Sequence, residues 1–150
     1  MGETTNEDEL NLLPYPGVDT LYKALYRNVE RIPNHNMLGT KTPNGYKWMS
    51  IKEVAEEAPL FAKGAMKLGL CPEVDAEGKK WRFIGIQSKN RKEWTLTHIA
   101  NMHMNCTTVA MYDTLGEEAS RFVINQTELI TIACSKDYVK KLSNMKIADK

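Results

Sequence analysis

Three short apolar segments, each followed by a longer segment of helical periodicity, most constrain how this chain can fold. They are residues 82–88 (RFIGIQS), 107–112 (TTVAMY) and 129–134 (LITIAC). Each has the length and composition of a buried strand. Strands that alternate with helices favour a parallel sheet joined by right-handed crossovers. The sequence therefore predicts an α/β fold, a parallel sheet flanked on both faces by helices.

Capping signals indicate where two of these helices begin. Asn90 and Thr114 each precede a glutamate by three residues, the pattern of a capping box. We expect helices to begin there, the second reaching about Gln126. The side chains expected to face the sheet are Ala119, Phe122 and Val123 in that helix, and Tyr138, Val139 and Leu142 in a last helix over residues 135–145.

A helix, a β-hairpin and a second helix are predicted before this alternation. Apolar residues at helical spacing indicate a helix from Asp19 or Thr20 to Ile32; they are Leu21, Leu25, Val29 and Ile32. Residues 37–41 and 46–49 read as strands, because Pro43-Asn44-Gly45 between them is a turn signal.

The second helix begins at a capping box formed by Ser50 and Glu53 and ends at Gly69. Pro59 inside it predicts a kink or a break. Residues 71–81 are expected to be a charged loop. The predicted buried face consists of Ile51, Val54, Ala55, Ala58, Ala62, Ala65 and Leu68.

The charge distribution separates residues 1–19 from the rest. This segment holds five acidic residues, no lysine or arginine, and two prolines, which predicts a flexible acidic lead-in before a domain over residues 20–150. The net charge of +1 argues against a nucleic-acid partner. The sequence has no apolar run of transmembrane length and no secretory signal pattern. Three widely spaced cysteines indicate reduced thiols, so we expect a cytoplasmic protein that is not secreted.

Four segments in order resemble the N-terminal part of long-chain fatty-acid–CoA ligases, members of the adenylate-forming AMP-binding superfamily. They are TLYKALYRNVERIPNHNMLGT (20–40), NGYKWMSIKEV (44–54), IGIQSKNRKEW (84–94) and VAMYDTLG (109–116). Lys92 and Ala110 stand where the family usually has proline, and Pro59 interrupts a helix that the family keeps free of it.

The resemblance implies fatty-acid activation with ATP and Mg²⁺ through an acyl-adenylate, followed by transfer of the acyl group to coenzyme A. Family members are several times longer than this chain. Their Gly-rich phosphate loop and catalytic lysine motif do not occur here, so no catalytic, cofactor-binding or metal-binding residue is assigned. The resemblance thus implies an incomplete AMP-binding domain, inactive alone and without bound cofactor, and it leaves peripheral contact with endomembranes open. The alternative is a non-catalytic, stand-alone α/β binding module or a truncated remnant.

Two groups of residues invite a ligand-binding interpretation beside a structural one. A zinc site would need ligands that point toward one another, but the helical spacing of His98 and His103 turns their side chains apart. Packing roles are therefore favoured for these histidines and for Cys106 and Cys134. Asp113 and Thr114 follow a strand end, where ligands bind in α/β folds, but helix capping accounts for both.

Three further groups have the same two interpretations. Arg91 and Trp94 could contact a ligand, although a solvated arginine and a core tryptophan are more usual. Residues 79–82 (KKWR) could meet anionic lipid headgroups, but a solvated loop is favoured. A lipid-accommodating surface could use methionines, which more often fill gaps in a core; they are Met102, Met104 and Met111.

Overall fold

The computed structural model describes residues 15–112 and 114–145, and its largest sheet is built around strand β4 (Lys79–Gln87). Strands β5 (Thr107–Ala110) and β6 (Ile132–Cys134) both run parallel to β4. Gly85 and Ile86 pair with both of them, so β5 and β6 lie on opposite sides of β4. Strand β3 (Glu73–Ala76) pairs antiparallel with the first half of β4. The predicted parallel sheet is confirmed, with one antiparallel strand added.

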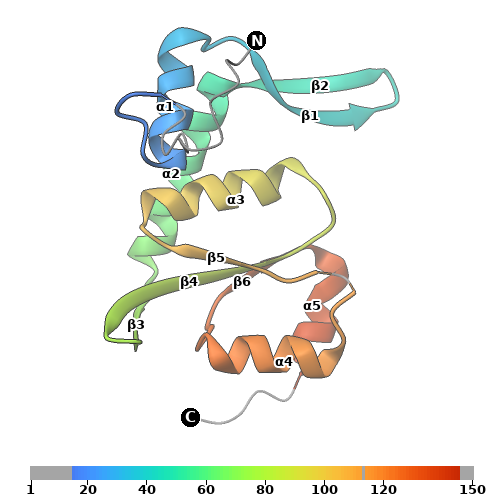
Figure 1. The fold of residues 1–150 in the computed structure, drawn as a ribbon. Coiled ribbons are helices and arrows are strands. Elements are labelled where there is room, and N and C mark those ends of the chain that lie inside the picture. Colours follow the sequence, from blue (N-terminus) through green and yellow to red (C-terminus); the bar gives the residue numbers. More distant parts are fainter. Residues whose placement is uncertain (1–14, 113, 146–150) are drawn as a thin grey trace, which may run out of the picture.

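Helices cover both faces of this sheet, as predicted (Figure 1). On one face, α2 (Ile51–Lys67) and α3 (Lys92–His103) form a core cluster around Ile84. On the other face lie α4 (Glu117–Gln126) and α5 (Lys136–Ser143), and Ile124 and Leu129 pack there against Phe83. The alternating side chains of β4 therefore serve two separate cores.

The N-terminal elements extend the first of these layers. Helix α1 (Leu21–Arg31) begins after Thr20, whose side chain accepts a hydrogen bond from the backbone N–H of Lys23 at 3.1 Å. Strands β1 (Asn36–Thr42) and β2 (Gly45–Ser50) form the predicted antiparallel hairpin, which projects away from the helices (Figure 1). The apolar stripe of α1 is only partly confirmed, because Leu25 packs on the core while Leu21 and Ile32 are exposed.

Helix α2 begins and ends where its capping residues predict. Ser50 and Glu53 form the complete capping box, with bonds of 2.7 and 3.2 Å. The helix continues through Pro59, so the predicted break does not occur. Gly69, at φ 65°, ends the helix. Six of the seven predicted buried residues are buried, but Leu68 is 73% exposed because it lies at the end of the last turn.

Residues 71–81 are not the loop that their charges suggest. They contain β3 and the start of β4, joined by a tight turn. Glu77 and Gly78 both have positive φ, at 53° and 70°, the conformation of a two-residue hairpin turn whose twist matches that of the strands. The charged side chains occupy a solvent-exposed hairpin instead of a loop.

Two predicted helix starts and several helix faces are wrong. Helix α3 begins at Lys92 with Arg91 as N-cap residue, and α4 begins at Glu117 with Gly116 as N-cap residue. In α4 the buried side chains are Ser120 and Ile124. The predicted inward residues that are instead exposed are Ala119, Phe122 and Val139. Where the apolar spacing of a helix fits two neighbouring faces, the layer that the helix packs against determines which face is buried. The local sequence does not specify that layer.

The acidic lead-in falls mostly outside the described residues. Of its last five residues, Val18 is buried and Tyr15 lies under the guanidinium of Arg27, with 3.7 Å from Cζ to the ring centre. Asp19 forms a salt bridge with Lys23 at 2.8 Å.

Candidate functional site

The carboxyl ends of β4, β5 and β6 meet at one edge of the sheet. The helices that follow β4 and β5 leave toward opposite faces, so the connections diverge at the end of β4 (Figure 1). Ligands in α/β proteins bind at such a divergence point. This edge is therefore the candidate site.

A pocket of about 200 Å³ opens between the end of β4, the first turns of α3 and the end of β6. Its floor is Ile86 and Ala133, and Ser88, Thr97 and Ser135 supply hydroxyl groups. Arg91, Glu93 and Trp94 form the remaining wall with Cys134. Apolar walls with a few converging polar groups suit a small organic ligand.

Trp94 separates this pocket from a second hollow on the β5 side. That hollow, of about 510 Å³, is lined by Lys89, Asn90, Trp94, Met111 and Tyr112 among others. Trp94 is therefore not the core residue that the sequence suggests. Its ring lies 5.6 Å from that of His98, centre to centre, and the residue is half-buried.

Arg91 has a specific partner. Its Nε donates to Oε2 of Glu93 at 2.6 Å. This contact raises the pKa of Arg91 and lowers the pKa of Glu93. Because the carboxylate of Glu93 is engaged by Arg91, the capping box predicted between Asn90 and Glu93 does not form. Arg91 is exposed, in agreement with the solvated-arginine interpretation, and it forms this ion pair at the mouth of the pocket.

The capping role predicted for Thr114 is also wrong. Thr114 is exposed and lines the second hollow, while the N-cap position of α4 belongs to Gly116, which offers no side chain. Asp113 lies outside the described residues. The neighbouring Tyr112 is 69% exposed at the end of β5. Tyr112 and Thr114 therefore each place a hydroxyl-bearing, exposed side chain beside the candidate site.

Gln87, the last residue of β4, is a feature that the sequence analysis did not single out. Its side chain is fully buried, yet neither Oε1 nor Nε2 has a hydrogen-bond partner among the residues that the structure describes. Leaving such groups unpaired costs roughly 1–3 kcal/mol each. A glutamine at the end of an otherwise apolar strand is the sequence signal that could have drawn attention to it.

The histidines and cysteines considered for zinc have other neighbours. His98 Nδ1 lies 2.9 Å from Oγ1 of Thr108, and His103 Nε2 lies 3.2 Å from the hydroxyl of Tyr26. Burial raises the pKa of the Cys106 thiol to about 12. Within residues 15–112 and 114–145, no three His, Cys, Asp or Glu side chains are grouped so as to hold a metal ion.

The three methionines do not form one surface. Met104 packs in the cluster under α2 and α3, whereas Met111 packs in the cluster over α4 and α5. Met102 is half-buried. Two of them thus fill separate cores, which favours the packing interpretation. Among the helices of the described residues, none has the length and apolar character needed to cross a bilayer.

Comparison with known proteins gives one consistent set of relatives. The chain is 32% identical over 134 residues to long-chain-fatty-acid–CoA ligase 5 of Rattus norvegicus, covering 89% of the chain and 19% of that protein. It is 31% identical over 138 residues to long-chain-fatty-acid–CoA ligase 1 of Homo sapiens, covering 91% of the chain and 19% of that protein. The chain therefore spans about a fifth of the length of these curated relatives. No protein-family model matches it.

Solved structures show the same fold. The adenylation domain of a carboxylate reductase from Mycobacterium chelonae aligns with a TM-score of 0.70 at 15% identity, covering 88% of this chain and 22% of that one. A putative long-chain-fatty-acid CoA ligase from Rhodopseudomonas palustris aligns with a TM-score of 0.68 at 16% identity, covering 84% of this chain and 29% of that one. The chain is thus similar along about nine-tenths of its length to long-chain fatty-acid–CoA ligases, of whose length it spans about a fifth, and it shares its fold with the matched parts of these solved adenylation and ligase structures.

Proposed function

We propose that this chain is the N-terminal segment of an ATP-dependent long-chain fatty-acid–CoA ligase. The observation that supports this most is the 31–32% identity to ligases of that name along about nine-tenths of the chain. The identity extends over the hairpin, the helices and the parallel strands together. A shared local motif would not produce a match of that length.

The proposed reaction is that of the whole enzyme. A fatty-acid carboxylate attacks the α-phosphate of ATP, which forms an acyl-adenylate and releases pyrophosphate. The thiol of coenzyme A then attacks the acyl carbon, which forms the thioester and releases AMP. ATP, Mg²⁺ and coenzyme A are thus the proposed cofactors and co-substrates of the complete protein, and a long-chain fatty acid is its substrate.

The residues of this chain serve the proposed enzyme as a scaffold. Among the residues that the structure describes, the sheet edge formed by β4, β5 and β6 offers hydroxyl groups and the Arg91–Glu93 ion pair, but no nucleophile hydrogen-bonded to a base. We assign no catalytic residue within the chain, and we propose that residues 1–150 alone do not form acyl-CoA.

We further propose a cytoplasmic location with peripheral contact to endomembranes. Long-chain fatty acids partition into bilayers, so an enzyme that activates them gains from working at a membrane surface.

Two measurements test the ligase proposal. The transcript is sequenced past the codon for Lys150, and we expect an open frame that continues into a Gly-rich phosphate loop with a lysine. The longer product should then form acyl-CoA from palmitate, ATP and coenzyme A, whereas purified residues 1–150 should not. An inactive longer product would contradict the ligase assignment, and activity of residues 1–150 would contradict the scaffold role. A stop codon would instead favour a stand-alone, non-catalytic binding module.

A further inference from the structure

The hairpin of β1 and β2 carries an exposed aromatic surface. Residues opposite each other in an antiparallel pair share a face, so Trp48 lies beside Gly39 and Tyr46 beside Lys41. The rings of Tyr46 and Trp48 stack, with their centres 5.6 Å apart and their planes at 30°. Tyr46 is nevertheless 60% exposed and Trp48 47% exposed.

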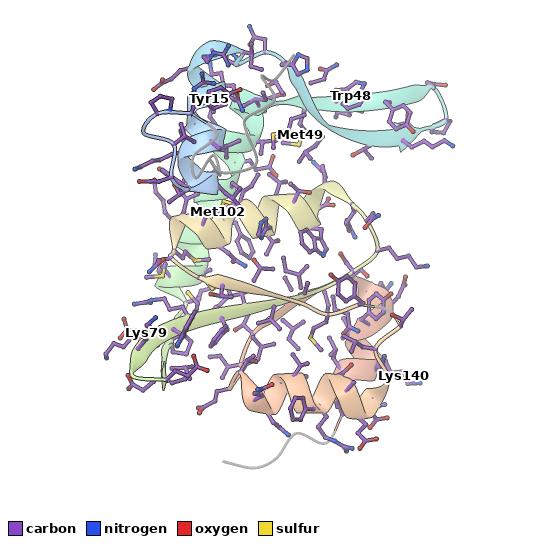
Figure 2. The ribbon with its side chains drawn as sticks, viewed as in Figure 1. Tyr15, Trp48, Met49, Lys79, Met102 and Lys140 are labelled. Carbon is purple, nitrogen blue, oxygen red and sulfur yellow. The ribbon has the colours of Figure 1, made fainter. Side chains whose placement is uncertain are left out.

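Gly39 is what allows the indole to lie flat on the neighbouring strand. A Cβ at Gly39 would come within 2.8 Å of the Trp48 ring. The opposite face of the hairpin carries Leu38 and Met49, which pack against the core cluster of α2 and α3. Figure 2 shows Met49 where the hairpin meets the helices and Trp48 farther out along it. The aromatic face is therefore not the one that anchors the hairpin.

The charge of the hairpin is entirely positive. Residues 36–50 contain Lys41 and Lys47 and no aspartate or glutamate. Neither lysine forms a salt bridge with a residue that the structure describes. The charge of Lys47 does act at longer range on Glu53, as a minor contribution to the lowered pKa of that carboxyl.

A cleft beside the hairpin extends this positive surface. It has a volume of about 490 Å³ and lies between Lys41 and Tyr46 of the hairpin and the start of α3. Its basic lining residues are Lys41, Lys89, Arg91 and Lys92, and its acidic ones are Glu93 and Asp137. Arg91 is neutralised by Glu93 at 2.6 Å, so the lysines carry the remaining positive charge.

The hairpin of β3 and β4 provides an internal comparison. It has the basic and aromatic run at residues 79–82, but Glu73 binds Lys80 at 3.0 Å and Arg82 at 2.8 Å. Trp81 donates its indole N–H to the carbonyl of Ala76 at 3.1 Å. Two of its three cations, Lys80 and Arg82, and its indole are thus already engaged within the hairpin. Lys79 lies at the far end of β4, away from Trp48 (Figure 2).

We propose that the aromatic face of the β1–β2 hairpin docks the protein on a bilayer that contains anionic phospholipid. Tryptophan and tyrosine favour the headgroup region, where their rings are apolar and their polar atoms stay hydrated. Lys41 shares the face of Tyr46 and Trp48 and adds roughly 1 kcal/mol near an anionic surface, whereas Lys47, opposite Thr40, lies on the other face. This inference names the surface for the membrane contact of the proposed function and rests on it. Its test requires no catalysis.

The test is co-sedimentation of the 150-residue chain with vesicles of phosphatidylcholine alone or mixed with phosphatidylserine. We expect binding to the mixed vesicles that weakens with added salt. Lys41→Glu should weaken it about thirtyfold, because a reversed charge removes roughly 2 kcal/mol of attraction. Lys79→Glu, which makes the same change of net charge on the other hairpin, should leave it within about twofold.

A second pair of variants tests the aromatic contribution. Trp48→Ala combined with Tyr46→Ala should weaken vesicle binding at least about tenfold, while Phe122→Ala, an exposed aromatic on α4, should not. Circular dichroism melts verify that each variant is folded, and Trp48→Phe supplies a milder change if the double variant is not. The emission of Trp48 should shift to the blue with vesicles, but not with soluble glycerophosphoserine.

Three results would overturn the proposal: no binding of the unsubstituted chain to the mixed vesicles, an equal loss in Lys41→Glu and Lys79→Glu, or full binding by the folded aromatic variant. None of them would bear on acyl-CoA formation by the longer product. Failure of the docking surface and failure of the ligase assignment are therefore distinguishable.

Discussion

The hydroxyl of Tyr26 in α1 lies 3.4 Å from the carbonyl oxygen of Ala55 in α2, to which it donates a hydrogen bond. That carbonyl is four residues before Pro59, which has no N–H to donate to it. The tyrosine thus replaces the missing helical donor. The same hydroxyl lies 3.2 Å from Nε2 of His103 in α3, so one side chain links three helices.

We expect Tyr26→Phe to lower the free energy of unfolding by about 1–2 kcal/mol, because the carbonyl of Ala55 loses the hydrogen bond that Tyr26 donates. In a Pro59→Ala background the backbone N–H of residue 59 can serve that carbonyl. The same change should then cost about 1 kcal/mol less. Urea unfolding of the four proteins of this cycle gives both values. Equal costs in the two backgrounds would show that the tyrosine does not compensate for the proline.

His103 should make stability fall when the pH is lowered from neutral. Burial lowers the pKa of His103 below its ordinary 6.5, so the unfolded chain binds its proton first. The associated stability is fully present above pH 6.5 and is lost as the pH falls toward the lower pKa of the folded state. The carboxyls of Glu53, Glu73 and Glu93 also have lowered pKa values, but they lose their contribution only below their ordinary 4.5.

The measurement is the thermal midpoint between pH 7.5 and pH 5 for the unsubstituted chain and for His103→Gln. We expect the midpoint of the unsubstituted chain to decrease across the window around pH 6, and that of His103→Gln to stay nearly level. The two other histidines, His35 and His98, remain in the variant as an internal control. An unchanged slope in His103→Gln would assign the effect to another group.

Two predicted caps should behave differently when removed. Ser50→Ala should lower the free energy of unfolding by about 1 kcal/mol, because Ser50 Oγ accepts from the N–H of Glu53 at 3.2 Å. Thr114→Ala should change it by less than about 0.5 kcal/mol, since that side chain is exposed and caps no helix. Chemical denaturation of the two variants measures both. Comparable losses would mean that Thr114 caps α4 in solution.

These two residues also illustrate what the sequence could predict. Ser50 ends a strand directly before its helix, so the capping signal and the strand boundary coincide. Thr114 carries the same signal, but the chain stays non-helical through Gly116 before α4 begins. Likewise, the spacing of apolar residues located α4 but not its buried face, because Phe122 and Ile124 suit different layers and only the packed sheet selects between them.

The sequence indicated where the candidate site lies, but not how its side chains pair and orient. The predicted parallel strands place their carboxyl ends at one edge, where ligands bind in α/β folds, and pockets lie there. The pairing of Arg91 with Glu93 depends on side-chain reach near a helix start, where a capping box was an equally good expectation. The outward orientation of Trp48 depends on which hairpin face meets the helices, which is a tertiary property.

Gln87 should be a position where the chain can be stabilised. Its amide is buried without a partner among the described residues, so Gln87→Met removes an unsatisfied polar group at similar volume and should raise the free energy of unfolding by about 1 kcal/mol. Asn101→Leu is the contrasting variant. Its Oδ1 is also buried without a partner among the described residues, but its Nδ2 donates to Oγ1 of Thr108 at 2.8 Å, and losing that bond should lower stability by about 1 kcal/mol or more.

Urea unfolding at neutral pH compares the two variants with the unsubstituted chain. Opposite signs are expected, although both substitutions replace a buried amide with an apolar side chain. Polar groups retained at a cost in stability are typical of functional edges, so in the longer product Gln87→Met should reduce acyl-CoA formation while raising the melting temperature. A loss of stability in Gln87→Met would show instead that its amide is satisfied in solution and that the residue is structural.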